Sequence, residues 1–331
     1  MRLASLPDAP RRDGRLVVVG DDMATCRPVD DLSLMGWLDA GLDGAGTEAR
    51  LGAAAPFDPA AALAPLPHAR GFLDGSAYVN HVELVRKARG AEMPERFWTD
   101  PLMYQGHAGF EPPCAAIPGD PEWGIDLEAE IAIITRDVPM GAAPDEGASL
   151  IALVTLINDV SLRSLIPDEL SKGFGFVQSK PPCAMAPLAV TPDDLPGWDG
   201  RMMHGPLMAD VNGAPFGRAE AGEEMTFDFG RLVAHAARTR PLAAGTVVGS
   251  GTVSNRDAGG GPGRPVAEGG RGYSCIAEQR MVETITQGAA RTPFLAHGDR
   301  MRIWMEDAAG RSLFGDIDQQ VTAPARREDA T

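Results

Sequence analysis

The segment WGIDLEAEIAIIT, residues 123–135, alternates its side chains as a β-strand does. Side chains two positions apart in a strand point to the same face, so Glu128 and Glu130 are expected side by side. Two carboxylates held this close repel each other unless water or a cation separates them. The opposite face is apolar, which indicates a buried strand with an acidic end. That end lies either in solvent or against a positive group.

A second apolar run, LIALVTLIND at 150–159, predicts another buried strand and ends on Asp159. Side chains at strand ends often build functional sites. Together with Glu128 and Glu130, this aspartate would complete an oxygen site for a hard cation such as Mg²⁺, Mn²⁺ or Ca²⁺. Spacing alone also allows the glutamates to be solvated or paired with basic side chains, and that alternative stays open.

The other patterns predict strands that outnumber helices and are not regularly interleaved with them. Helices are expected over 31–41, 76–90, 144–150 and 229–240, and further strands over 15–20, 207–211, 215–219, 246–255, 299–306 and 312–321. This arrangement indicates an α+β fold rather than a doubly wound sheet. We expect a small N-terminal region with an Ala/Pro-rich linker over 1–70 and a main domain over 71–325.

Composition narrows the class of protein. The 331 residues carry a net charge of −16, which weighs against nucleic acid and anionic membranes as partners. No segment approaches the ~18 apolar residues of a membrane helix, and the N-terminus lacks the apolar core of a signal peptide. The four cysteines are widely spaced without a CxxC motif, which predicts free thiols and a cytoplasmic location.

Six short motifs follow one another in the order typical of the fumarylacetoacetate hydrolase family, which the chain resembles from about residue 74 onward. They are DGSAYVNH, LMYQGHAG, DLEAEI, INDVSLR, GFVQSKPPCAMAP and GSGTVSN. The resemblance implies a mixed β-sandwich roll with few helices. It also implies a divalent cation, Mg²⁺ with Ca²⁺ or Mn²⁺ as alternatives, held by Glu128, Glu130, Asp159 and, as in the longer members, Asp74.

The resemblance further implies that the enzyme uses water to cleave a carbon–carbon bond in a β-diketo acid of the fumarylacetoacetate or acylpyruvate type. His81 matches the catalytic base, and histidine suits proton transfer near neutral pH. Taken without the resemblance, His81 could simply pack on its helix. Glu278, expected on a late strand, is the candidate that orients His81. Lys180 matches the lysine that stabilises the oxyanion, and an exposed loop lysine is the alternative.

Substrate contacts are implied for Arg163, Tyr104 and Thr252. A guanidinium group fits a carboxylate through two parallel hydrogen bonds, so Arg163 is expected to bind the substrate carboxylate. The alternative for Arg163 is a surface ion pair with Asp168 or Glu169.

Ile166 stands where the family often has a glutamine, so the part of the substrate that it meets stays open. Hydration, isomerisation or decarboxylation on the same metal scaffold is the main alternative to hydrolysis. A ligand-binding relative without catalysis is a further alternative, and the presence of His81 and Lys180 with the acidic residues counts against it. The expected partners are a small diketo acid and, because relatives are commonly dimers, a second copy of the chain.

Overall fold

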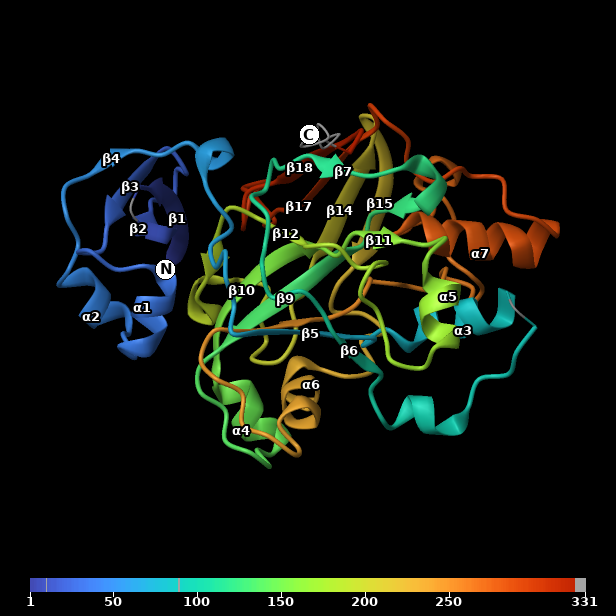
Figure 1. Cartoon of the computed structure of the whole chain (residues 1–331), viewed down its shortest axis with the longest axis horizontal. Helices are drawn as coiled ribbons and strands as arrows, with labels where there is room; N and C mark the ends of the chain where they lie inside the picture. The colour runs from blue at the N-terminus through green and yellow to red at the C-terminus, as the bar shows by residue number, and fades with distance from the viewer. Residues whose placement is uncertain (10, 89, 325–331) are drawn as a thin grey trace, which may run out of the picture.

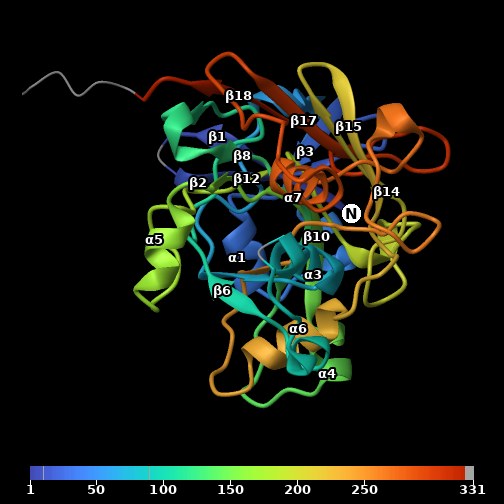
Figure 2. The same cartoon turned by 90° about the vertical axis from the view of Figure 1, so that its right-hand side faces the viewer.

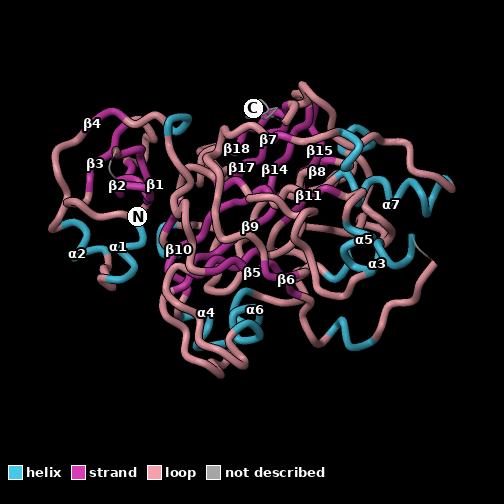
Figure 3. The backbone as a smooth tube through the Cα atoms, viewed as in Figure 1, coloured by secondary structure: helices cyan, strands magenta, loops and turns pink. Residues whose placement is uncertain are grey.

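The computed structural model describes residues 1–9, 11–88 and 90–324. Within this part of the chain, strands form a mixed sheet of eleven strands, a sheet of five and a pair of two. The α-helices lie at the periphery of the strands (Figure 3). They are α1 (Leu34–Asp39), α2 (Gly44–Glu48), α3 (Val79–Ala88), α4 (Pro144–Ser149), α5 (Ile166–Ser171), α6 (Phe229–Ala236) and α7 (Ile276–Gln287).

The large sheet runs through the whole molecule (Figure 1). Its spatial order is β4 (Ala55–Pro56), β3 (Thr25–Pro28), β2 (Arg11–Val19), β1 (Arg2–Asp8), β13 (Ala189–Val190), β10 (Ile151–Asn158), β9 (Ala129–Thr135), β16 (Thr246–Gly249), β5 (Gly71–Gly75) and β6 (Met103–Gln105), with β12 (Ala184–Met185) also paired to β10. Neighbouring strands are antiparallel except β16 and β5, which are parallel. The sheet is therefore mixed, as expected.

The smaller sheet packs against the large one. Its order is β15 (Ala214–Glu220), β14 (Pro206–Val211), β17 (Arg300–Met305), β18 (Ile317–Thr322) and β7 (Ile117–Pro118), and the separate pair is β11 (Ser161–Leu162) with β8 (Ile125–Asp126). Ile131 and Ile133 of β9 join a core cluster that also holds Ile303 of β17. Ala132 and Ile134 join the cluster on the opposite face. Each fully buried aliphatic side chain contributes roughly 1.5–3 kcal/mol to the stability of the folded state, so side chains on both faces of β9 stabilise the centre of the fold.

The expected strand at 123–135 is interrupted. It is divided into β8 and β9, and Glu128 lies in the gap between them. The backbone N–H of Glu128 donates to the side-chain oxygen Oδ1 of Asn158 at 3.0 Å instead of to a neighbouring backbone carbonyl. When a side chain accepts the hydrogen bond that the backbone of a neighbouring strand would otherwise accept, the regular pairing of the two strands is interrupted. The alternation in the sequence is real, but it spans two short pieces of strand.

Several other expected boundaries were wrong, including the end of the strand expected over 246–255, which the structure places at Gly249. The helix expected from residue 76 begins at Val79, because the N–H groups of Ser76 and Ala77 donate to backbone carbonyls of distant loops instead of starting the helix. The strand expected from residue 312 begins at Ile317. The expected helices at 144–150 and 229–240 are confirmed as α4 and α6, although α6 ends earlier, and the strand at 150–159 is confirmed as β10.

The N-terminal region extends the large sheet. In Figure 1 its strands β1–β4 and helices α1–α2 lie at the left of the molecule. β1 pairs with β13 through Arg2 with Val190 and Leu3 with Ala189, which joins this region to the rest. The division of the chain at residue 70 stays a prediction. No helix within the described ranges has both the length and the apolar character needed to cross a bilayer.

Candidate active site

Three buried carboxylates meet where central strands of the large sheet end. Asp74 lies on β5, Glu130 on β9, and Asp159 directly after β10. One oxygen of each carboxylate lies within 4.8 Å of the other two. A Cβ atom on Gly249 would lie only 2.3 Å from Asp74 Oδ1 and 3.0 Å from Glu130 Oε2. The space between these carboxylates therefore depends on glycine at this position of β16.

The positive charge near the three carboxylates is too small to neutralise all of them. Burial, and then the charge of Asp159, raise the pKa of Asp74 from 3.8 to about 8. Burial and the charges of Asp74 and Asp159 raise the pKa of Glu130 well above its usual range. Among the described residues, no group donates a hydrogen bond to either buried oxygen of Glu130. A shared proton or a cation must separate these groups, and their all-oxygen donor set fits a hard divalent cation.

Lys180 neutralises one side of this cluster. Its Nζ donates to Asp159 Oδ2 at 2.5 Å and to Glu128 Oε2 at 2.6 Å. Burial would lower the pKa of Lys180, but the charges of Asp159 and Glu128 outweigh it and raise the pKa. Lys180 is only 9% exposed, so the alternative of an exposed loop lysine was wrong. Glu169 holds the preceding loop by accepting N–H bonds from residues 177–179.

Glu128 lies beside the three-carboxylate group rather than within it. One of its oxygens lies within 4.8 Å of potential ligand atoms of His81 and Cys275. Burial alone would raise the pKa of Glu128, but Arg163 and Lys180 lower it below its usual range. Of the four predicted metal ligands, the structure thus brings three together and engages the fourth with two cations.

Arg163 is occupied by acidic side chains of the protein. Its Nε donates to Asp126 Oδ2 at 2.8 Å and its Nη2 to Glu128 Oε1 at 2.5 Å. The alternative of a surface pair with Asp168 or Glu169 was wrong, because Arg163 points inward. Asp126 was missed by the sequence reasoning, although it continues the alternation of Glu128 and Glu130 in DLEAE.

Asp126 also fixes the start of α7. Its two carboxylate oxygens accept the N–H groups of Ile276 and Ala277 at 2.7 and 2.9 Å. Free N–H groups and the helix dipole favour a negative charge at this position. Asp126 therefore connects Arg163 with the helix that carries Glu278.

His81 on α3 contacts Glu278 directly. Its Nδ1 lies 2.7 Å from Glu278 Oε2, and Glu278 Oε1 accepts a hydrogen bond from Ser254 at 2.9 Å. The expectation that Glu278 lies on a strand was wrong: it lies in the first turn of α7, which Cys275 caps. A carboxylate on Nδ1 favours the tautomer that leaves Nε2 free to accept a proton.

An inner cavity of about 210 Å³ joins these groups, and its wall includes Asp74, His81, Tyr104, Glu128, Arg163, Ile166, Lys180 and Thr252. The Tyr104 hydroxyl donates to Asp159 Oδ2 at 2.7 Å. The predicted substrate-binding residues Tyr104, Arg163 and Thr252 therefore line one space with His81. Figure 2 views the molecule from this end, where α3, α5 and α7 lie.

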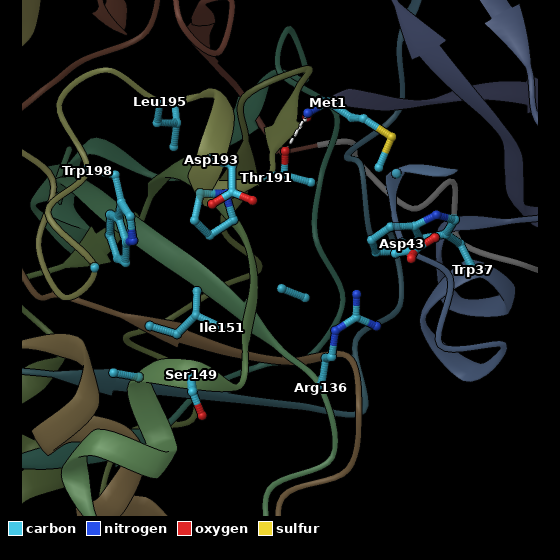
Figure 4. A pocket seen from close by; sticks show the side chains of 15 residues that line it. Met1, Trp37, Asp43, Arg136, Ser149, Ile151, Thr191, Asp193, Leu195 and Trp198 are labelled. Atoms are coloured by element: carbon cyan, nitrogen blue, oxygen red, sulfur yellow. Dashed lines mark hydrogen bonds between the residues drawn. The ribbon is translucent and has the colours of Figure 1, made fainter. Parts of the chain in front are cut away.

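A larger cavity of about 630 Å³ lies elsewhere (Figure 4). Trp37 and Asp43 of the N-terminal region face Asp193 and Trp198 across it, and Arg136 lies between them. Among the residues that the structure describes, its lining holds no histidine and no cluster of buried carboxylates. Size alone would have selected this cavity, whereas proton-transfer groups and metal ligands select the inner cavity.

Comparison with known proteins settles the family. Residues 71–322 match the sequence model of the fumarylacetoacetate (FAA) hydrolase C-terminal domain. The chain belongs to the fumarylacetoacetate hydrolase family. The resemblance drawn from the six motifs is confirmed. No curated protein matches the chain.

Several solved structures share this fold. Fumarylacetoacetate hydrolase from Exiguobacterium antarcticum is 18% identical, with 98% of this chain and 99% of that chain covered and a TM-score of 0.64. Maleylpyruvate hydrolase from Sphingobium sp. SYK-6, in complex with manganese(II) ion and pyruvate, is 17% identical, with 98% and 100% covered and a TM-score of 0.62. The 5-carboxymethyl-2-hydroxymuconate delta-isomerase from Mycobacterium smegmatis is 20% identical, with 98% and 100% covered and a TM-score of 0.59.

These likenesses confirm the mixed-sheet fold with few helices. The similar structures include both hydrolases and isomerases. Membership of the family therefore identifies the chain with a group of enzymes that share a scaffold, while the reaction must be argued from the residues of the site.

Proposed function

We propose that this protein is a hydrolase that depends on a divalent metal ion and uses water to cleave a carbon–carbon bond in a β-diketo acid. The observation that carries the proposal is the buried group of Asp74, Glu130 and Asp159 beside a cavity that also holds His81, with both oxygens of Glu130 lacking a hydrogen-bond donor in the described part of the chain. The proposed ion is Mg²⁺, with Mn²⁺ or Ca²⁺ as alternatives, because all donors in this group are oxygens.

In the proposed site, Asp74, Glu130 and Asp159 would hold the ion, with Glu128 beside them. A bound divalent ion would polarise the substrate carbonyl and stabilise the enolate that leaves. His81 takes a proton from water, whose oxygen forms a bond to the acyl carbonyl carbon. The bond from that carbon to the methylene carbon then breaks, and its electron pair becomes the enolate of the 2-oxo acid. Returning the proton to the methylene carbon completes the reaction.

Other side chains of the cavity support this chemistry. Glu278 keeps His81 in the required tautomer and stabilises the imidazolium that forms during the reaction. Lys180 uses two of its three N–H groups on Asp159 and Glu128. The third N–H of this buried ammonium is proposed to stabilise the negative charge that develops on the carbonyl oxygen. Tyr104 and Thr252 line the same cavity and are proposed to contact the substrate.

Arg163 contributes differently from the expected substrate carboxylate contact. Its bonds to Asp126 and Glu128 hold two acidic segments of the site together. We therefore propose that Arg163 is a positioning residue in this protein.

Isomerisation, hydration or decarboxylation is the second candidate, and the isomerases among the similar structures favour keeping it. The test is incubation of the purified protein with Mg²⁺ or Mn²⁺ and a panel of acylpyruvates and fumarylacetoacetate. Cleavage into two acids, with the oxygen of heavy-oxygen water in the new carboxylate, would support hydrolysis. An intact product of unchanged mass would indicate isomerisation, gain of water without cleavage would indicate hydration, and release of CO₂ would indicate decarboxylation.

The homodimer is also a proposal, carried over from the family. Light scattering coupled to size-exclusion chromatography would measure the mass in solution, and the mass of one chain would contradict it.

A further inference from the structure

A second cavity continues outward from the inner one. It has a volume of about 410 Å³. The two cavities share five lining residues, namely His81, Val85, Arg163, Ile166 and Phe176. Ligand sites commonly occupy roughly 300–1,000 Å³, so the inner cavity of about 210 Å³ is small for a complete substrate. Any substrate larger than a short diketo acid must extend into this outer cavity.

Apolar side chains make most of the outer wall. Val85 and Ala88 come from α3, at positions that share a helix face with His81, and Met281 comes from α7. Ile166 and Phe176 lie at the junction, because they line both cavities. A chain that leaves the inner cavity therefore meets an apolar surface first, where a glutamine in place of Ile166 would have offered hydrogen bonds.

The charged groups of the outer cavity are largely engaged by the protein. Arg163 already binds two carboxylates, and the Nδ1 of His81 binds Glu278. Arg280 is the remaining cation, and no carboxylate within residues 1–9, 11–88 and 90–324 pairs with it. Its guanidinium lies 4.4 Å from the centre of the Phe294 ring and donates to a backbone carbonyl. Arg280 is thus held against an aromatic wall of the cavity.

We propose that the outer cavity binds the acyl part of the substrate as an apolar alkyl or aryl group longer than acetyl, without a terminal carboxylate. The inference rests on the proposed function, because it places the diketo acid head in the inner cavity. It assigns to Val85, Ile166, Phe176 and Met281 the selection of substrate by the length and polarity of its acyl group.

Binding of 2-oxo acids to the Mn²⁺-loaded full-length protein tests this proposal without requiring turnover. Calorimetry would measure the Kd of pyruvate, 2-oxohexanoate and 2-oxooctanoate. Each methylene group buried in the cavity should tighten binding about fourfold. A Kd that does not fall with chain length, or absence of binding by all three acids, would overturn the proposal.

A matched pair of ligands tests the end of the chain. We expect 2-oxooctanedioate, which ends in a carboxylate, to bind about tenfold more weakly than 2-oxooctanoate, because a carboxylate loses its hydration against an apolar wall. Tighter binding of the dioate, with loss of this preference in Arg280→Gln, would overturn the apolar class and assign Arg280 to a terminal carboxylate.

A matched pair of variants tests the wall. Met281→Gln keeps the length of the side chain but makes it polar, and should reduce the preference for 2-oxooctanoate over pyruvate about tenfold. Met140→Gln is the control, because Met140 is 63% exposed and lines neither cavity. An unchanged preference in Met281→Gln would contradict the assignment. If the chain-length series holds while no acylpyruvate is cleaved, the outer cavity is supported and the proposed hydrolysis fails.

Discussion

Replacing Glu130 with glutamine should stabilise the metal-free protein and weaken its response to metal. Glu130 lies within 4.8 Å of Asp74 and Asp159 and has no hydrogen-bond donor among the described residues. Two full charges at that distance repel by about 3.5 kcal/mol at an effective dielectric constant of about 20. Protonation relieves part of this repulsion, so we expect a gain of about 1–3 kcal/mol in the free energy of unfolding at pH 8.

The gain in stability on binding Mn²⁺ should be smaller in the variant than in the wild type. A ligand at 100 times its Kd adds about 2.7 kcal/mol to the stability of the folded state. A tenfold loss of affinity in Glu130→Gln would reduce this gain to about 1.4 kcal/mol at the same Mn²⁺ concentration. The variant should therefore be the more stable protein without metal and should gain less when Mn²⁺ is added.

Thermal unfolding followed by differential scanning fluorimetry measures both effects. One kcal/mol corresponds to a shift of about 2–4 °C in Tm for a protein of 150–250 residues, and to a somewhat smaller shift in a longer chain. The increase in Tm of the metal-free variant should be larger at pH 8 than at pH 5, where the carboxylates of the wild type hold protons. Glu146→Gln, on the exposed face of α4, is the control and should change neither quantity. A metal-free Tm below the wild type together with an unchanged Mn²⁺ response would refute the reasoning.

Four other results are expected. His81→Ala should lower kcat at least about 100-fold while the Mn²⁺-induced increase in Tm is retained, and Glu278→Gln should lower kcat with a similar increase in Tm. Steady-state kinetics and thermal unfolding measure both effects. Loss of the Mn²⁺-induced increase in His81→Ala would indicate a structural role for His81. Without metal, Tm should fall as pH rises from about 4 to 8, because the folded state keeps a proton on Asp74, whose pKa is raised to about 8, and the unfolded state releases this proton. The free energy of unfolding should fall by about 1.4 kcal/mol per pH unit for each such proton. A Tm that does not change with pH would show that the cluster does not retain the proton. Arg163→Met should lower stability by about 3–5 kcal/mol, because Asp126 and Glu128 lose a buried partner; a change in KM without loss of stability would instead support a substrate contact.

Alternating charges connect the parts of the site. Asp126, Arg163, Glu128, Lys180 and Asp159 follow one another through hydrogen bonds of 2.5–2.8 Å. A buried charge is costly unless it is paired and hydrogen-bonded, and each charge of this series has a partner of opposite sign. Glu130 lies beyond the end of the series. The site is therefore rigidly paired on one side and short of positive charge on the side proposed for the metal.

Local sequence was enough to predict the central strands and the acidic character of the site. The apolar runs around Glu130 and before Asp159 are long enough to be buried in any fold that has a core, and the side-chain period of two determines which residues share a face. The motifs were enough to identify the family, because their order along the chain is independent of how the chain folds.

Packing between distant segments determined which charged side chains pair with one another. Glu128 lies in a gap between two strands because the side chain of Asn158 takes its backbone hydrogen bond, which no alternation pattern encodes. His81 meets Glu278 across 197 positions of sequence because α3 packs on α7. Arg163 binds protein carboxylates because burial makes an unpaired charge more costly than a paired one. Which side chains become partners depends on their distance in space, and this distance is set only when the sheets and helices have assembled.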